Sequence, residues 1–368
     1  MSARRRFVPA SVGLTAFGLF VLVLAAQEPR KPTNLSAPVP QGRMPNRVHV
    51  FEDYETEIEK RWWLRGTPEV KNVPPGSTRA CRAAPSKDFD DKMGDPKATY
   101  HAVVFNPVPG PPVGPNTRLS FRCWLQGTGT LRVQIFSLTN NYHRHLTLTD
   151  LPQGRWAAAT VDMTQALRPD GSGGPLSENE RIDDIQFYVD PPAELIIDDI
   201  VLYDAALPDE QRPFPKRVIF TGWFDTGQQG KEWPGAFAIV AKPKPHTWKA
   251  AKSVPNPETG TPWVRMHLRG ERPLGAATHL RFRYLLTGGD RMQLHLANSK
   301  TKDNYRLELT GLKQGEWAEA TVDFAASQRT DGRPGTPKAG DRVEELWFVL
   351  PKGAELLVDD VLLYEPGE

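Results

Sequence analysis

The sequence predicts an all-β protein that contains two tandem β-sandwich domains. Three observations support this prediction. The residues from Leu119 to Asp204 recur from Leu280 to Glu365 at a constant offset of 161, with about a third of the aligned positions identical. Apolar and polar side chains alternate with the period of a β-strand in many short runs. The 35 prolines and 30 glycines favour a chain with many turns, which is typical of two-sheet sandwiches.

The N-terminal segment predicts export. Three arginines at positions 4–6 precede an apolar run from Phe7 to Leu24, and small residues follow at positions 25 and 26. This is the pattern of a signal peptide over residues 1–26, and a polar, Pro-rich linker over residues 27–46 follows it. The protein is therefore expected to be secreted or to lie in the periplasm or cell envelope. It would contact a membrane only through this segment, if the segment stays uncleaved.

The repeat sets the expected domain bounds. Residues 47–205 form the first sandwich, residues 206–215 a short charged and Pro-rich linker, and residues 216–368 the second sandwich. The first strands are expected at Val48–Glu52 and Val218–Thr221, with Thr221 at the position of Glu52. Each half has about 150 to 160 residues, which is an ordinary size for one domain.

The period-2 alternation also predicts which side chains leave the core. In the strand over 131–136 the apolar residues at 131, 133 and 135 pack inward, and the same rule applies to the strands over 143–148 and 185–189. If these strands are neighbours, their outward side chains form one face in each half. In the first half this face would contain Gln134, Phe136, His143, His145, Gln186 and Tyr188. In the second half it would contain Gln293, His295, Arg306 and Trp347.

A repeated pair of aspartates interrupts the last strand of each half. Asp198 and Asp199 lie within one apolar run, and Asp359 follows at the corresponding place in the second half. Neighbouring side chains of a strand point to opposite faces, so one carboxylate of each pair points towards the packed side. A buried carboxylate needs a cation or several donors. Two explanations remain open: backbone N–H groups and solvent satisfy the pair, or one carboxylate binds a structural ion.

Composition and motifs exclude several functions. The net charge of +2 and the lack of a basic patch give no support for nucleic-acid binding. The sequence contains no nucleophile elbow, zinc-protease motif, P-loop or dinucleotide fingerprint, so it is not expected to be an enzyme. His143 and His145 share one strand face, but no third metal ligand is evident. The two cysteines, Cys81 and Cys123, form either one disulfide or two buried thiols.

The repeated motifs resemble those of a known superfamily. Four motifs carry the resemblance: a first strand that ends in Phe51-Glu52, a Leu-x-Phe-Arg run, a Gly-x-Trp before Thr-Val-Asp, and a closing Ile-Asp-Asp-Ile-Val-Leu strand. They are similar to the motifs of carbohydrate-binding modules of the galactose-binding-like jelly-roll superfamily. The resemblance covers nearly all of the chain after residue 46. It implies jelly-roll sandwiches that bind sugar on a sheet face or at loop tips.

The same resemblance implies a structural Ca²⁺ between the first and last strands. The matching positions are Glu52 with Asp198 or Asp199 in the first half, and Asp359 in the second half, where Asp225 could replace the missing first-strand acid. The expected function is a secreted, non-catalytic protein that binds a polysaccharide or glycan through the two faces named above. The alternative is a structural or protein-interaction scaffold of the cell envelope.

Overall fold

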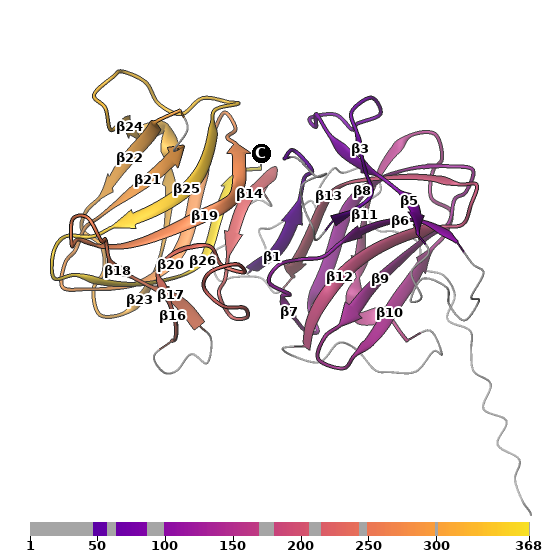
Figure 1. The fold of residues 1–368 in the computed structure, drawn as a ribbon, viewed down its shortest axis with the longest axis horizontal. Coiled ribbons are helices and arrows are strands. Elements are labelled where there is room, and N and C mark those ends of the chain that lie inside the picture. The colour runs from indigo at the N-terminus through magenta and orange to yellow at the C-terminus, as the bar shows by residue number, and fades with distance from the viewer. Residues whose placement is uncertain are drawn as a thin grey trace, which may run out of the picture.

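The computed structural model describes residues 47–56, 64–86, 99–168, 180–205, 215–242, 249–298 and 301–367. Within these residues the chain forms four antiparallel sheets, two from the first half and two from the second, and helix is limited to two short 3₁₀ turns, Met163–Gln165 and Phe324–Ala326. The all-β prediction with two sandwiches is therefore confirmed. We call strands β1 to β13 unit 1 and strands β14 to β26 unit 2. Figure 1 shows the two units side by side, with β1 and β14 between them.

Unit 1 consists of sheets 1 and 2, which pack their apolar faces together. Sheet 1 has the order β11 (Trp156–Asp162), β8 (Thr117–Gln126), β13 (Glu194–Asp204), β4 (Ala80–Arg82) and β3 (Thr67–Glu69), and β1 (Arg47–Glu52) also pairs with β13. Sheet 2 has the order β10 (Tyr142–Leu148), β9 (Leu131–Ser137), β12 (Glu180–Val189), β6 (Tyr100–Phe105) and β2 (Leu64–Arg65), with β5 (Ala84–Ser86) on β6 and β7 (Pro112–Val113) on β12.

Unit 2 repeats this plan in sheets 3 and 4. Sheet 3 has the order β16 (Ala238–Ala241), β17 (Lys249–Lys252), β26 (Glu355–Glu365), β20 (His279–Thr287) and β23 (Trp317–Asp323), and β14 (Arg217–Gly222) also pairs with β26. Sheet 4 has the order β15 (Gly235–Ala236), β19 (Pro262–Pro273), β25 (Arg342–Val349), β21 (Met292–Asn298), β22 (Asp303–Leu309) and β24 (Gln328–Arg329), with β18 (Val254–Pro255) on β19.

The predicted alternation of apolar and polar side chains is confirmed for the inward positions of β9 and β21. Leu131, Val133 and Ile135 are buried in the core of unit 1, and Met292, Leu294 and Leu296 are buried in the core of unit 2. Large aromatic residues fill the space between the sheets, since Phe121 packs edge-on against Phe187 at 4.8 Å and Phe282 against Phe348 at 5.0 Å. These pairs correspond at the offset of 161, so the duplication preserves core packing.

The repeated Thr-Val-Asp sequence also has a structural explanation. Asp162 and Asp323 each end a strand, and each accepts a hydrogen bond from a backbone N–H of the following 3₁₀ turn, from Thr164 at 3.0 Å and from Ala325 at 2.8 Å. A carboxylate at this position satisfies a donor that the turn leaves free. This repeated motif therefore serves the fold.

The two cysteines are free buried thiols. Cys81 on β4 and Cys123 on β8 both pair with Ile197, from opposite sides of β13. Strands two places apart in a sheet are separated by about 9–10 Å, whereas a disulfide needs about 4–7 Å between Cα atoms. The disulfide left open by the sequence is therefore excluded in this fold, and burial raises the pKa of the Cys123 thiol to about 12.

Several predictions fall on residues outside the described ranges. These are the signal peptide over 1–26, most of the linker over 206–215, and the N-terminal linker over 27–46. Among the residues that the structure does describe, no helix is long and apolar enough to cross a bilayer.

Candidate ligand-binding faces and the interface between the units

The outward side chains predicted for unit 1 do share one face of sheet 2. Strands β10, β9 and β12 are neighbours, with His143 opposite Phe136, His145 opposite Gln134, and Gln134 opposite Gln186. The condition that the sequence could not test, the adjacency of these strands, is therefore met. Whether the face binds a sugar stays a prediction.

The polar groups at the centre of this face bond to one another. Gln134 Nε2 donates to Gln186 Oε1 at 2.6 Å, and the Tyr188 hydroxyl donates to the same oxygen at 2.8 Å. Arg132 lies over the rings of Tyr188 and Tyr100, at 4.7 and 4.6 Å. Gln134, Gln186 and Tyr188 are at most 5% exposed. Their hydrogen-bonding groups are therefore largely used within the protein.

The edge of the same face is more open. Phe136 and His143 contact each other at 4.8 Å between ring centroids and are half-buried, as is His145. Burial, with a smaller effect of Arg132, lowers the pKa of His145, so its imidazole is neutral at neutral pH. A ligand that contacts unit 1 on this face would meet the rings of Phe136, His143 and His145 first.

The outer face of unit 2 is built differently at the corresponding positions. We define this outer face of sheet 4 by the outward side chains Trp263, Arg265, His267, Gln293, His295, Arg306, Glu308, Glu345 and Trp347. His295 and Trp347 correspond to Gln134 and Gln186 at the offset of 161. They are also cross-strand partners, and their rings stack at 5.5 Å with an interplanar angle of 22°. An aromatic pair in unit 2 therefore takes the place of the amide pair in unit 1.

Glu345 fixes the side chain of Trp347 on this outer face. It accepts a hydrogen bond from Trp347 Nε1 at 2.7 Å and one from Arg265 Nε at 2.9 Å. Trp263 meets Trp347 edge-on at 5.7 Å. Side chains held in this way lose little rotamer freedom when a ligand binds, which favours affinity.

Two ring nitrogens on the outer face of sheet 4 have no hydrogen-bond partner among the described residues. They are His295 Nε2 and Trp263 Nε1, and both are buried as atoms. Burial, with a smaller effect of Arg306, lowers the pKa of His295 to about 4. The imidazole of His295 is therefore neutral at neutral pH, and both nitrogens lie beneath the surface of this face. Trp263, Arg265, His267 and Glu345 were not predicted, although the alternation within Trp263–Leu268 could have placed the first three.

The aspartate pairs occupy a β-bulge in each unit. The pairing register of β13 with β8 shifts between Asp198 and Val201, and the residues Asp199 and Asp360 have positive φ angles of 47° and 48°. Asp is among the few residues that tolerate this conformation. The bulge therefore gives the repeated pair a conformational reason besides any ion.

In unit 1 an arginine supplies the positive charge beside the aspartate pair. Arg122 lies 3.6 Å from Asp198 and forms a close ion pair with Asp199. Burial and the neighbouring Asp199 raise the pKa of Asp198, which Arg122 partly offsets. In the part of the chain that the structure describes, no three His, Cys, Asp or Glu side chains gather as metal ligands. The positive charge beside this pair comes from Arg122, and the expected Ca²⁺ stays a prediction that chelation tests.

In unit 2 the positive charge beside the aspartate pair Asp359–Asp360 comes partly from a residue of unit 1. Arg47, the first residue of β1, bonds to Asp360 at 2.6 Å, lies 3.7 Å from Asp359 and forms a close ion pair with Asp225. Lys242 also forms a close ion pair with Asp359. Asp225 does come close to the aspartate pair, as expected, but through a shared arginine. The strand register places Gly222, and not Thr221, at the position of Glu52.

The interface contains further bonds between the units. Trp223 Nε1 donates to the carbonyl oxygen of His49 at 2.7 Å, and Thr221 Oγ1 donates to that of Val48 at 2.6 Å. In return, Arg217 of unit 2 bonds to Asp53 of unit 1 at 2.9 Å. A separate apolar cluster includes Val48 and Val201 of unit 1, and Val218 and Leu362 of unit 2, among others. The two units are therefore packed against each other.

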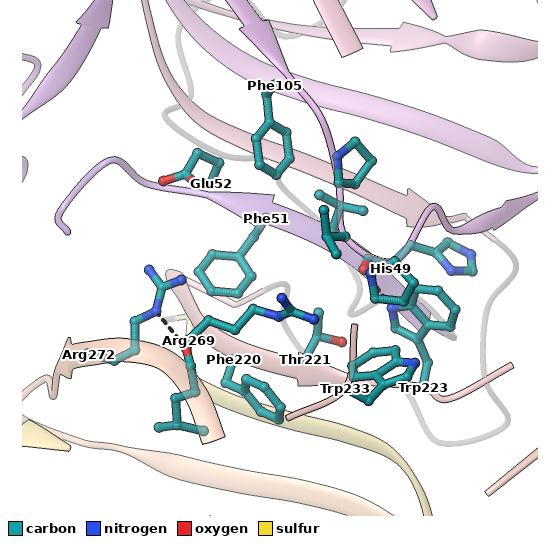
Figure 2. A pocket seen from close by; sticks show the side chains of 15 residues that line it. His49, Phe51, Glu52, Phe105, Phe220, Thr221, Trp223, Trp233, Arg269 and Arg272 are labelled. Carbon is teal, nitrogen blue, oxygen red and sulfur yellow. Dashed lines mark hydrogen bonds between the residues drawn. The ribbon is translucent and has the colours of Figure 1, made fainter. Parts of the chain in front are cut away.

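A pocket lies at this interface, between β1 of unit 1 and β14 and β19 of unit 2 (Figure 2). It has a volume of about 80 Å³. Its walls are mostly apolar, with five Phe and Trp residues among the fifteen residues that line it, and Arg269 and Arg272 provide its cationic groups.

Comparison with known proteins gives only distant matches. No protein-family model matches the chain, and no curated protein matches it. Among solved structures, the tandem CBM22-1–CBM22-2 domains of Paenibacillus barcinonensis Xyn10C share 12% identity, with 90% of this chain and 99% of that chain covered and a TM-score of 0.28. Carbohydrate-binding modules of the β-sandwich superfamily share 13% identity, covering 72% and 92%, with a TM-score of 0.25. An allantoicase shares 10% identity, covering 88% and 90%, with a TM-score of 0.21.

The chain is thus similar to tandem carbohydrate-binding β-sandwich domains, the class that its motifs resemble. The assignment of the fold rests on the strand order given above, and the function is inferred from this chain's own residues.

Proposed function

We propose that this protein is a secreted, non-catalytic carbohydrate-binding protein whose main sugar-binding surface is the outer face of sheet 4. The stacked pair of Trp347 and His295, beside Trp263, is the observation that carries the proposal. A pyranose ring has an apolar C–H face that packs on an indole, while its hydroxyls bond to surrounding polar groups. Arg265, Glu345 and Gln293 provide such groups around the tryptophans.

The comparison of the two units supports unit 2 as the main site. At equivalent positions unit 1 has Gln134 and Gln186, which are nearly buried and bonded to each other. A sugar would have to break that bond to reach them, whereas Trp347 is already held by Glu345 and is half-exposed. The face of unit 1 then contributes weaker contacts through Phe136, His143 and His145.

The test is binding to a glycan array, followed by calorimetry with the polysaccharide that binds. Trp347→Ala is expected to lower the affinity about tenfold or more, since an aromatic contact contributes about 1–2 kcal/mol. Trp156→Ala is the matched control, because Trp156 lies on β11 of sheet 1, away from both outer faces, with its Nε1 bonded to Asn72. The control should bind like the unchanged protein. Equal losses in both variants would contradict the assignment of the site.

A scaffold of the cell envelope is the second candidate, and the interface favours it. Arg47 and Arg217 each connect one unit to buried carboxylates of the other, so the tandem would act as a stiff spacer. If no glycan binds and the protein is instead retained by envelope proteins, this second function replaces the first.

A further inference from the structure

The pocket between the units contains a half-buried cation, Arg269, to which no carboxylate of the described residues is bonded. Arg269 lines the pocket, and its Nη2 atom is buried without a hydrogen-bond partner among the described residues. Its neighbour Arg272 differs, because it donates to the Leu268 carbonyl at 3.2 Å and lies 3.6 Å from Asp53. A buried charge is costly unless a partner compensates it. Arg269 is therefore the group in this pocket that most needs an anionic partner.

A bulge in β19 directs Arg269 to this place. The register of β19 with β25 shifts between His267 and Arg272, and Arg269 has a positive φ of 58°. A long side chain in that conformation is uncommon and strained, and such residues cluster at functional sites. In Figure 2 the Arg269 side chain extends into the middle of the pocket, between Phe51 and Trp233.

The charges that face Arg269 do not neutralise it. Arg272 repels it, and Glu232, whose carboxylate accepts a hydrogen bond from the Gln228 backbone, attracts it from a distance. Burial and Arg272 together lower the pKa of Arg269 to about 10. The carboxylate of Glu52, which accepts a hydrogen bond from the Tyr54 N–H, lies at one end of the pocket, and Trp223 lies at the other (Figure 2).

The size and walls of the pocket limit the ligand. A volume of about 80 Å³ is several times the roughly 10–15 Å³ that one water needs in the same measure. It is too small for a chain of sugars but has room for one charged group and part of the ring that bears it. Phe51, Phe220 and Trp233 would cover the apolar face of that ring. A guanidinium is the group best suited to bind a planar carboxylate through two parallel hydrogen bonds.

We propose that the pocket between the two units binds the carboxylate of an acidic sugar, such as a uronic acid, through Arg269. This site is separate from the outer face of sheet 4, and its existence does not depend on sugar binding there. It would let the tandem recognise the charged end or side group of a glycan at the junction of the units.

Trp223 and Trp233 line the pocket and provide an intrinsic fluorescence signal. We would titrate the full-length protein with D-glucuronate, with D-glucose as the neutral sugar of the same ring, and with inorganic phosphate as a non-sugar anion. D-glucuronate is expected to change the fluorescence in a saturable way, and glucose and phosphate are not. Arg269→Gln should weaken glucuronate binding at least tenfold, Arg269→Lys should weaken it less, and the exposed control Arg333→Gln should leave it unchanged.

Two further measurements separate the possible outcomes. Arg269→Gln should keep or raise the melting temperature, because it removes a half-buried charge that has no bonded carboxylate among the described residues, so loss of binding cannot be ascribed to unfolding. It should also keep binding of neutral polysaccharide, which Trp347→Ala should weaken. Absence of a saturable response to glucuronate, an equal response to phosphate, or full binding by Arg269→Gln would overturn the proposal, whatever happens at the outer face of sheet 4.

Discussion

Arg47 should contribute more to stability than any exposed arginine of the chain. Its side chain is 8% exposed and forms ion pairs with Asp225, Asp359 and Asp360. All three aspartates are buried or nearly so. Arg47→Met would keep the aliphatic packing and remove the charge. Burial tends to raise the pKa of Asp360, but Arg47 and Arg283 outweigh it and hold that pKa at about 2.

The expected loss follows from the cost of breaking a buried ion pair. Removing one partner of such a pair typically costs about 3–5 kcal/mol, because the other charge stays buried without compensation. Lys242 still pairs with Asp359, and Arg283 still bonds to Asp360 at 2.9 Å. The loss should therefore be near the lower end, about 3 kcal/mol. For a unit of this size that is about 6–12 °C in melting temperature.

Differential scanning calorimetry measures this effect, with Arg333→Met as the control. Arg333 also pairs with two aspartates, Asp331 and Asp303, but its side chain is 63% exposed, so its loss should cost less than about 1 kcal/mol. Adding Asp225→Asn to Arg47→Met should recover part of the lost stability, because it removes a carboxylate left without its arginine. Equal shifts for the two arginine variants would refute the role given to Arg47.

Three other outcomes follow from the same structure. Chelation of Ca²⁺ should leave the melting temperature unchanged, since Arg122 already supplies a positive charge beside Asp198 and pairs closely with Asp199. A clear decrease on chelation, reversed by added Ca²⁺, would support the predicted ion. Burial and Arg47 lower the pKa of His49 to about 3, so between that pH and about 6.5 the unfolded chain binds a proton that the folded one does not. The free energy of unfolding should therefore fall as the pH is lowered from 7 to 5.5, and less so in His49→Gln, as urea titrations at each pH would show. Cys81 and Cys123 should react with a thiol reagent only after unfolding, and a reductant should not change the melting temperature; resistance to the reagent in denaturant would indicate a disulfide.

The alternation of the strands explains why the fold and the neighbourhood of the face residues could be predicted. Burial of one side of a strand fixes its register, so the inward positions of β9 and β21 follow from the sequence alone. The adjacency of β10, β9 and β12 depends on the order of the strands in sheet 2. The sequence does not give that order, so the shared face could be predicted only on the condition that these strands are neighbours. Exposure could not be predicted, because it depends on cross-strand bonds such as that between Gln134 and Gln186.

The counter-ion of the aspartate pair was missed although the sequence contained a signal for it. Arg122 and Arg283 correspond at the offset of 161, and both bond to the second aspartate of their own unit. A repeated arginine beside a repeated acid is better explained by an ion pair than by turn chemistry. Arg269 gave a weaker signal: the alternation through Leu268 stops at Arg269-Gly270, and a break of this kind indicates a bulge.

The exchange of charges across the interface bears on whether the repeats are independent. Arg47 of unit 1 compensates carboxylates of unit 2, and Arg217 and Arg272 of unit 2 compensate Asp53 of unit 1. A unit 2 expressed from residue 216 would retain Asp225, Asp359 and Asp360 but lack the arginine they share, and unit 1 alone would lack the arginines that pair with Asp53. We therefore expect each copy to be less stable alone than within the tandem. The junction can therefore hold a shaped pocket, because a binding site between two domains needs their relative position to be fixed.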